Sequence, residues 1–168
     1  MRSTARWLAT VSVWALICSP GALRGDDHSG HEDLPAGPIR DRHELMEGQA
    51  AQAEEINEAF SIGSEGFDTG IIQRAAQGIA LSAHRIPELF PKGSTDPKSR
   101  ALPAIWQNWD KFVALAKQLE EQANSLSAAA GAEDDENLKE KSQKMFATCK
   151  SCHDQFRAPK DDEKKKGS

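Results

Sequence analysis

Apolar residues recur at spacings of three and four in four separate stretches of the chain, and polar residues fill the positions between them. This period is typical of amphipathic α-helices, and no stretch shows the alternation that is typical of strands. The stretches cover about residues 38–60, 68–86, 103–131 and 133–158. Four such helices bury their apolar faces most simply by packing together. We therefore expect an all-α fold, an antiparallel four-helix bundle, in one domain over residues 38–158.

Residues that typically begin and end helices agree with these boundaries. Pro38 is a favourable first residue for the first helix, and Asp68 is a suitable N-cap for the second. Gly131 is the expected C-cap of the third helix, whose apolar stripe includes Trp106 and Trp109. We expect this stripe to form one continuous helix that turns both tryptophans toward the core. The core is also rich in alanine, which leaves room for an internal group.

The ends of the chain differ from this domain. Residues 1–25 have a basic start, an apolar run over residues 7–17 and then several small residues, a sequence typical of an export signal. Because the apolar run is too short to cross a bilayer, we expect a periplasmic protein without a membrane span. Residues 26–37 form an acidic lead-in, and residues 159–168 form a charged tail. Cleavage of the signal would remove Cys18 and leave two cysteines.

The overall charge restricts the classes of partner. The 168 residues include 21 Lys plus Arg and 26 Asp plus Glu, which gives a formal net charge of −5. This acidic balance argues against nucleic acid as a partner, because binding to phosphates needs clustered Lys and Arg. An acidic surface would instead steer the protein toward a basic protein partner in a salt-sensitive encounter.

The two remaining cysteines lie in one short motif near the C-terminus. Cys149, Cys152 and His153 form a C-x-x-C-H sequence, which is the arrangement used for covalent attachment of haem c. On a helix, residues three and four apart share a face, so both thiols can reach one haem and the imidazole can reach its iron. A thioredoxin-like site would lie beside a βαβ pattern, and a structural zinc site would need further Cys or His ligands. The sequence contains neither, so the motif predicts one covalent haem c.

This haem motif is the last of four segments that resemble a known family. The segments are RHELM at residues 42–46, LFPKGS at residues 89–94, IWQNWDKF at residues 105–112 and CKSCHDQFR at residues 149–157. On these segments the chain resembles the class II c-type cytochromes, the cytochrome c-prime family, from Ile39 to Arg157. The resemblance implies a four-helix bundle with a single haem attached close to its C-terminal end.

The resemblance also implies what lies on the distal side of the haem. In that family the residue four positions after an early arginine faces the iron, and counting from Arg42 gives Met46. A methionine there would be the second axial ligand, as in the low-spin branch, and Arg42 would lie near a haem propionate. A small rotation of the helix leaves two alternatives open. Leu45 would cap the iron and leave it five-coordinate, or His43 would be the ligand.

Together these observations predict a periplasmic monohaem electron carrier and not an enzyme. Haem c would be bound through Cys149 and Cys152, with His153 and Met46 as axial ligands to the iron. Keeping both ligands in each oxidation state keeps the geometry fixed, so little reorganisation opposes electron transfer. The expected partners are redox proteins that dock transiently, and a homodimer is left open. The alternative function is that of a five-coordinate cytochrome c-prime that binds nitric oxide or carbon monoxide.

Overall fold

The computed structural model of the protein describes residues 34–61, 68–132 and 135–159. The expected export signal over residues 1–25, most of the acidic lead-in and the charged tail from residue 160 onward lie outside the described residues. Glu133 and Asp134, at the predicted start of the last helix, also lie outside them.

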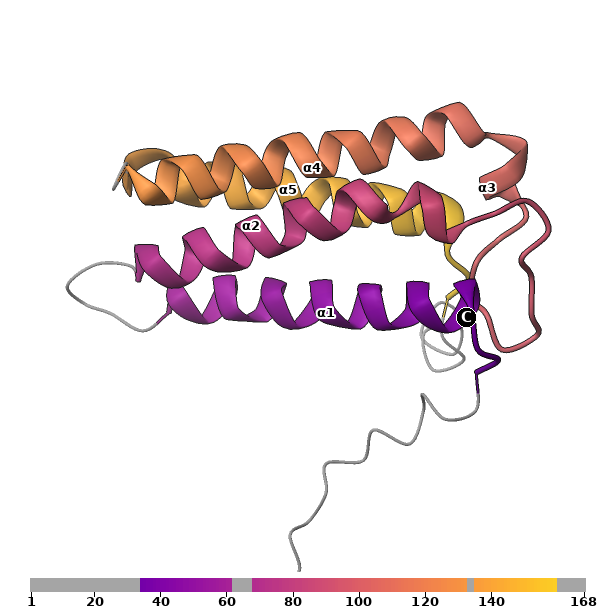
Figure 1. Ribbon diagram of the computed structural model, residues 1–168. Helices are drawn as coiled ribbons and strands as arrows, with labels where there is room; N and C mark the ends of the chain where they lie inside the picture. Colours follow the sequence, from indigo (N-terminus) through magenta and orange to yellow (C-terminus); the bar gives the residue numbers. More distant parts are fainter. Residues whose placement is uncertain (1–33, 62–67, 133–134, 160–168) are drawn as a thin grey trace, which may run out of the picture.

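Four long helices form an antiparallel bundle, as the periodicity predicted (Figure 1). They are α1 (Pro38–Ala59), α2 (Thr69–Arg85), α4 (Trp109–Gly131) and α5 (Asp135–Phe156). Between α2 and α4 lie a short 3₁₀ helix, η1 (Pro87–Leu89), a connecting loop over residues 90–103, and a single-turn helix, α3 (Ala104–Gln107). Within the described residues the only β-type pairing is an isolated antiparallel bridge between Ala101 and Arg157. The fold is therefore all-α.

The predicted starts of the first two helices are confirmed. Pro38 is the first residue of α1 and follows Gly37, whose positive φ of 102° is a backbone conformation that favours glycine. Asp68 caps α2, because its carboxylate Oδ1 accepts a hydrogen bond of 3.0 Å from the backbone N–H of Ile71. This bond satisfies one of the donors that the first turn of a helix leaves without a partner.

The expectation of one continuous third helix was wrong. The chain breaks at Asn108, which has φ −126° and ψ 46°, so that α3 ends before α4 begins. The amide Nδ2 of Asn108 donates to the carbonyl of Ala104 at 3.0 Å, a local bond that competes with helix continuation. As a result Trp109 lies at the surface, 36% exposed, and not in the core. Gly131 is the last residue of α4, and the C-cap is Ala132.

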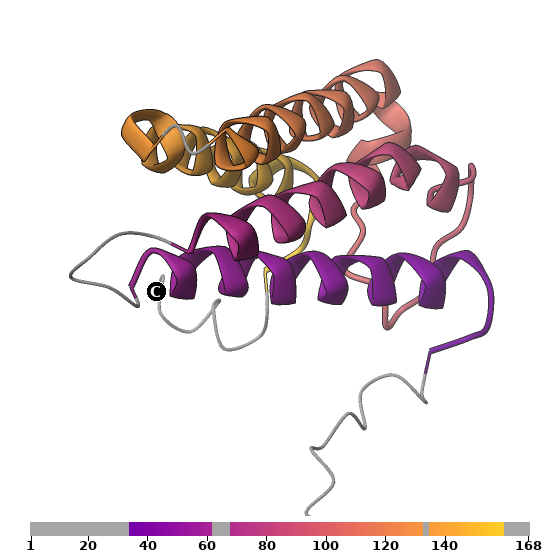
Figure 2. The same ribbon diagram turned by 60° about the vertical axis from the view of Figure 1, so that its left-hand side comes forward.

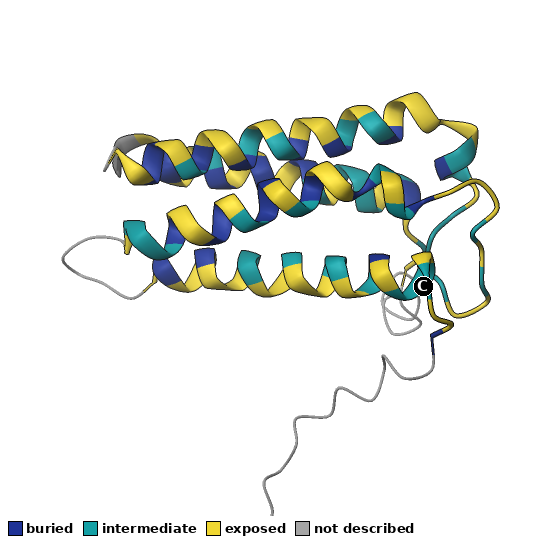
Figure 3. Cartoon of the chain, viewed as in Figure 1, coloured by how far each residue is buried: buried dark blue, intermediate teal, exposed yellow. Residues whose placement is uncertain are grey.

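The bundle is tightly packed along three of its four edges. α1 packs along α2, α2 along α4, and α4 along α5, whereas α1 and α5 approach each other much less closely (Figure 2). Burial follows the same division (Figure 3), since α2 and α4 bury a continuous apolar stripe while α1 buries only three residues, Arg42, Ile56 and Ala59. The bundle therefore has an open edge between its first and last helices.

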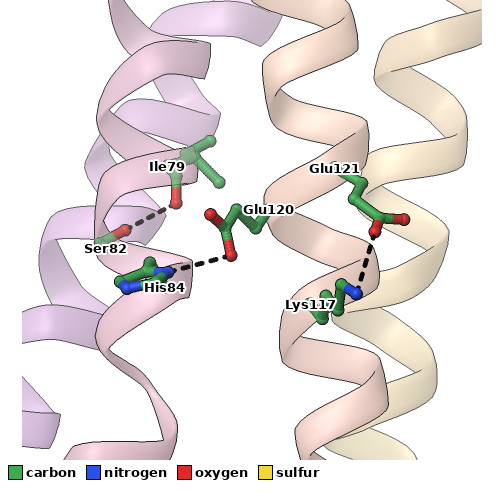
Figure 4. A network of polar contacts seen from close by, with 6 residues as sticks. All are labelled: Ile79, Ser82, His84, Lys117, Glu120 and Glu121. Carbon is green, nitrogen blue, oxygen red and sulfur yellow. Dashed lines mark hydrogen bonds and ion pairs between the residues drawn. The ribbon is translucent and has the colours of Figure 1, made fainter.

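Polar contacts on the outer surface lie both between and along the packed helices. The Nδ1 atom of His84 on α2 lies 3.3 Å from a carboxylate oxygen of Glu120 on α4, and Lys117 pairs with Glu121 along α4 at 3.9 Å (Figure 4). Exposed pairs of this kind contribute little stability, about 0–1 kcal/mol each. Among the described residues, none of the helices combines the length and hydropathy that a membrane crossing requires.

Candidate functional site

A cavity of about 470 Å³ lies at the open edge of the bundle, between α1 and α5. The connecting loop closes one end of it, where Figure 1 shows the start of α1, the loop and the end of α5 together. Its lining residues come from all of these elements and from α4: Leu34, Ile39, Arg42, His43, Met46, Glu47, Phe90, Lys98, Ser99, Arg100, Ala101, Phe112, Cys152, His153, Phe156 and Arg157.

One wall of the cavity contains most of the predicted haem motif. Cys152 and His153, both half-buried on the last turn and a half of α5, line it directly. Cys149, one turn earlier on the same helix, is also half-buried and packs against the hydrophobic core, but it is not among the lining residues. Both thiols are free. The helix thus brings Cys152 and His153 to the cavity and places Cys149 one turn farther into the bundle.

The surroundings of this wall favour uncharged side chains. Burial raises the pKa of the Cys152 thiol to about 11, and the neighbouring Cys149 acts in the same direction. Burial also raises the pKa of Cys149. The pKa of His153 is lowered, first by burial and then by the positive charges of Arg157 and Arg100. His153 is therefore held as neutral imidazole, the form whose ring nitrogen can donate its lone pair to a metal.

The opposite wall is formed by α1. Met46 and His43 both line the cavity, as does the carboxylate-bearing Glu47, and the Nδ1 atom of His43 lies 3.9 Å from Glu47 Oε1. Leu45 instead lines a second, more polar cavity of about 310 Å³ between α1 and α2, together with Glu44. Adjacent residues on a helix point about 100° apart, so α1 turns its methionine and its leucine toward different spaces.

Arg42 lines the main cavity, and its guanidinium is hydrogen-bonded to the connecting loop. Its side chain is 4% exposed, and its guanidinium donates to the carbonyl of Ser94 at 2.7 Å and to the hydroxyls of Ser94 and Ser99, each at 3.1 Å. It also lies over the ring of Phe90, 4.8 Å from the centroid. Burial lowers the pKa of Arg42, and the negative charge of Asp96 opposes that shift.

Several lining residues were not predicted from the sequence. They come from the second half of the connecting loop, namely Lys98, Ser99, Arg100 and Ala101, and from Phe112 at the base of the cavity. The ring of Phe112 makes edge-on contacts with Phe90 at 4.9 Å and Phe156 at 5.4 Å, so one aromatic cluster joins the loop, α4 and α5. The apolar stripe indicated that Phe112 is buried, but no local signal indicated which loop residues face α5.

The residues present fit a haem group. A volume of about 470 Å³ falls within the range of small-molecule sites, roughly 300–1,000 Å³. The apolar side chains Ile39, Phe90 and Phe112 suit the flat macrocycle, and the cations Arg100 and Arg157 at the same cavity suit its two carboxylates. A thiol and an imidazole stand on one wall and a thioether on the other, and all three can bond to a haem or to its iron.

Comparisons with known proteins identify the family. The family model described as Cytochrome C' matches residues 37–157. A cytochrome c' of Rhodopseudomonas palustris is 36% identical over 114 residues, 67% of this chain and 76% of that protein. A cytochrome c-554 of Cereibacter sphaeroides is 36% identical over 125 residues, 71% of this chain and 79% of that protein. The crystal structure of cytochrome c' from Thermochromatium tepidum has a TM-score of 0.66 at 27% identity and covers 79% of this chain and 100% of that one.

Proposed function

The chain belongs to the cytochrome c' family, a family of haem c proteins, and from this premise we propose that it is a periplasmic electron carrier with a six-coordinate iron. Cys149 and Cys152 would bind the haem through thioether bonds, and His153 and Met46 would be the two axial ligands. The observation that carries this proposal is the position of Met46, which lines the same cavity as His153 from the facing helix.

Each of these residues has one task in an electron carrier. The haem supplies the one-electron redox couple when bound, and the chain determines how much its surroundings change on transfer. His153 is held neutral and ready to ligate, as described above. The thioether of Met46 is a soft, uncharged donor that binds iron in both oxidation states. The apolar side chains Ile39, Phe90 and Phe112 at the cavity would limit contact between the macrocycle and water, which would keep the reorganisation small.

The proposal is tested by optical spectroscopy of protein matured with a c-type haem assembly system. Wild type should show a low-spin ferric spectrum with the charge-transfer band of a methionine–iron bond. Met46→Leu should lose that band, become high-spin and bind carbon monoxide in the ferrous state. Met145→Leu is the matched control, because Met145 is fully buried on α5 and does not line the cavity. That variant should keep the wild-type spectrum.

The same experiment separates the alternative function. A wild-type protein that is already high-spin and takes up carbon monoxide readily would show that Met46 is not a ligand. The five-coordinate, gas-binding reading would then replace the electron carrier. A spectrum that persists in Met46→Leu but changes in His43→Gln would assign the sixth position to His43, which lines the same cavity.

For partners, we propose transient docking to a basic redox protein. The outer face of α1 bears six exposed acidic residues, Asp41, Glu44, Glu47, Glu54, Glu55 and Glu58. Glu47 also lines the cavity, so a partner bound to this face would approach the haem. Electron-transfer rates should fall with rising salt, and charge reversal of Glu54 and Glu55 should weaken that dependence.

Two further expectations from the sequence remain proposals. For export, the mass of the periplasmic protein should correspond to loss of about the first 22–25 residues, as a signal-peptidase site after Ala22 or Gly25 requires.

For the homodimer, Leu81 on the outer face of α2 is 67% exposed and offers an apolar contact. Sedimentation of wild type against Leu81→Lys would test whether that face associates.

A further inference from the structure

The open edge of the bundle is bridged by the connecting loop, residues 90–103, which is bonded to α1 on one side and to the end of α5 on the other. On the α1 side, Arg42 reaches Ser94 and Ser99 through three hydrogen bonds of 2.7–3.1 Å. These partners lie 52 and 57 positions away in the sequence. In the described residues, α1 and α5 pack against each other far less than the neighbouring helix pairs of the bundle do.

The attachment to α5 is made by the backbone. The N–H of Leu102 donates to the carbonyl of Phe156 at 2.9 Å, and the N–H of Ala158 donates to the carbonyl of Arg100 at 2.8 Å. The Nε–H of Arg100 adds a bond of 2.8 Å to the carbonyl of Ala158. The loop is thus fixed directly after the helix turn that presents His153, and Arg42 fixes it to the helix that presents Met46.

Because Arg42 is buried, its guanidinium needs these hydrogen bonds. Arg42 is 4% exposed, and a buried guanidinium is costly unless its N–H groups are hydrogen-bonded. Here its bonds are to neutral oxygens, while its face covers the ring of Phe90. The fork of N–H groups reaches a carbonyl and two hydroxyls at once. A lysine would preserve the charge but not this fork.

The position of Arg42 along α1 explains why this contact matters for Met46. Met46 follows Arg42 by four residues, a little more than one helical turn, so the two side chains lie on one face of α1. A rotation of α1 by about 100° would bring Leu45 or Glu47 to the place of Met46. An anchor one turn away limits that rotation, and it acts where α1 has little other packing.

We propose that Arg42 is a positioning residue: through Ser94 and Ser99 it anchors α1 to the connecting loop, and through the loop to α5, and so holds Met46 in line with His153. This inference rests on the proposed ligation of iron by Met46. It assigns Arg42 a task within the chain, whereas the family resemblance implied a bond to a haem propionate.

The test uses the haem-loaded full chain with Ser94→Ala and Ser99→Ala combined, which leaves Arg42 and its charge in place. Loss of even one hydrogen bond to a charged group corresponds to about a tenfold change in an equilibrium. The population without the methionine–iron band should therefore rise about tenfold, and ferrous carbon monoxide binding should speed by a similar factor. Amide hydrogen exchange in residues 39–46 should also become faster.

Gln49→Ala is the matched control. Gln49 lies on α1, three residues after Met46, and donates a part-buried bond of 2.8 Å to Ser82 on α2. Its removal loosens α1 without touching the loop, so the band should persist. Arg42→Lys is the second variant, in case the double variant does not fold. It should behave like the serine variants, because it keeps the charge and loses the fork.

The outcomes separate the two proposals. A wild type without the methionine–iron band overturns the proposed function, and this inference with it. A wild type with the band, together with serine variants and an Arg42→Lys variant that all keep it fully, overturns this inference alone, because the serine variants retain the bond from Arg42 to the Ser94 carbonyl. The propionate role would replace it if Arg42→Lys shifted the reduction potential while the band and the carbon monoxide kinetics stayed unchanged.

Discussion

Two glycines in the long helices should respond differently to the same substitution. Gly48 lies within α1 with open space around it, and an added Cβ would meet nothing within 4 Å. Gly78 lies within α2 under the side chain of Gln52, and an added Cβ would fall 2.1 Å from Gln52 Nε2 and 2.8 Å from its Cδ. Alanine at position 78 therefore requires the Gln52 amide to move.

The magnitudes follow from these contacts. Replacing glycine by alanine inside a helix stabilises by about 1 kcal/mol, which is the full effect expected for Gly48→Ala. The obstacle to alanine at position 78 is the far end of a flexible side chain, so moving it should cost about 1 kcal/mol, the low end of the range for overpacking, and Gly78→Ala should be close to wild type. In a Gln52→Ala background the obstacle is gone, and the same change should stabilise by about 1 kcal/mol. The implied coupling between positions 52 and 78 is roughly 1 kcal/mol.

The assay is urea unfolding of the four haem-loaded variants and wild type, followed by far-ultraviolet circular dichroism. Midpoints convert to free energies if the slopes agree. The reasoning would be refuted by a Gly78→Ala protein as stabilised as Gly48→Ala, since this would mean that Gln52 does not pack on α2. A Gly78→Ala change that gave no stabilisation even without the Gln52 side chain would show that another group obstructs position 78.

Three further unfolding measurements test the core, a helix cap and a surface pair. Phe112→Ala should lose about 3–5 kcal/mol, because it empties the aromatic cluster beneath the cavity; a loss below 1 kcal/mol would contradict the packing. Asp68→Ala should lose about 1 kcal/mol with its cap on Ile71, while Asp68→Asn should be close to wild type. His84→Gln should change stability by less than about 1 kcal/mol, because its contact with Glu120 is exposed; a larger loss would show a role beyond this pair.

The helices could be predicted from the sequence because their signals are local. Apolar residues at spacings of three and four, Pro38 at the first position of α1 and Asp68 as a cap are each readable within one or two turns. The break at Asn108 was not predicted, because the apolar stripe continues across it. It depends on how one amide bonds back to Ala104, a choice that periodicity does not report.

The site, like the fold, could be predicted from the sequence only where its signals are local. The C-x-x-C-H motif and the spacing of Arg42 and Met46 are local, and the structure brings Met46 and His153 to one cavity. The bonds from Arg42 to Ser94 and Ser99 are not local, since more than 50 residues separate the partners. Serines in a loop that contains three prolines are typical of turns, so no sequence pattern marked these two as acceptors for a buried cation.

The open edge itself explains why one helix of the bundle is so polar. A helix that packs on two neighbours needs a broad apolar stripe, as α2 and α4 have, but α1 buries only Arg42, Ile56 and Ala59. Residues 39–52 of α1 line two cavities, so protein packing alone stabilises α1 less than α2 and α4. A haem between α1 and α5 would supply the missing apolar contacts, and the anchor at Arg42 would determine which residue of α1 meets the iron. Cofactor binding and the docking of α1 are therefore parts of one equilibrium, because whatever binds only the folded bundle also stabilises it.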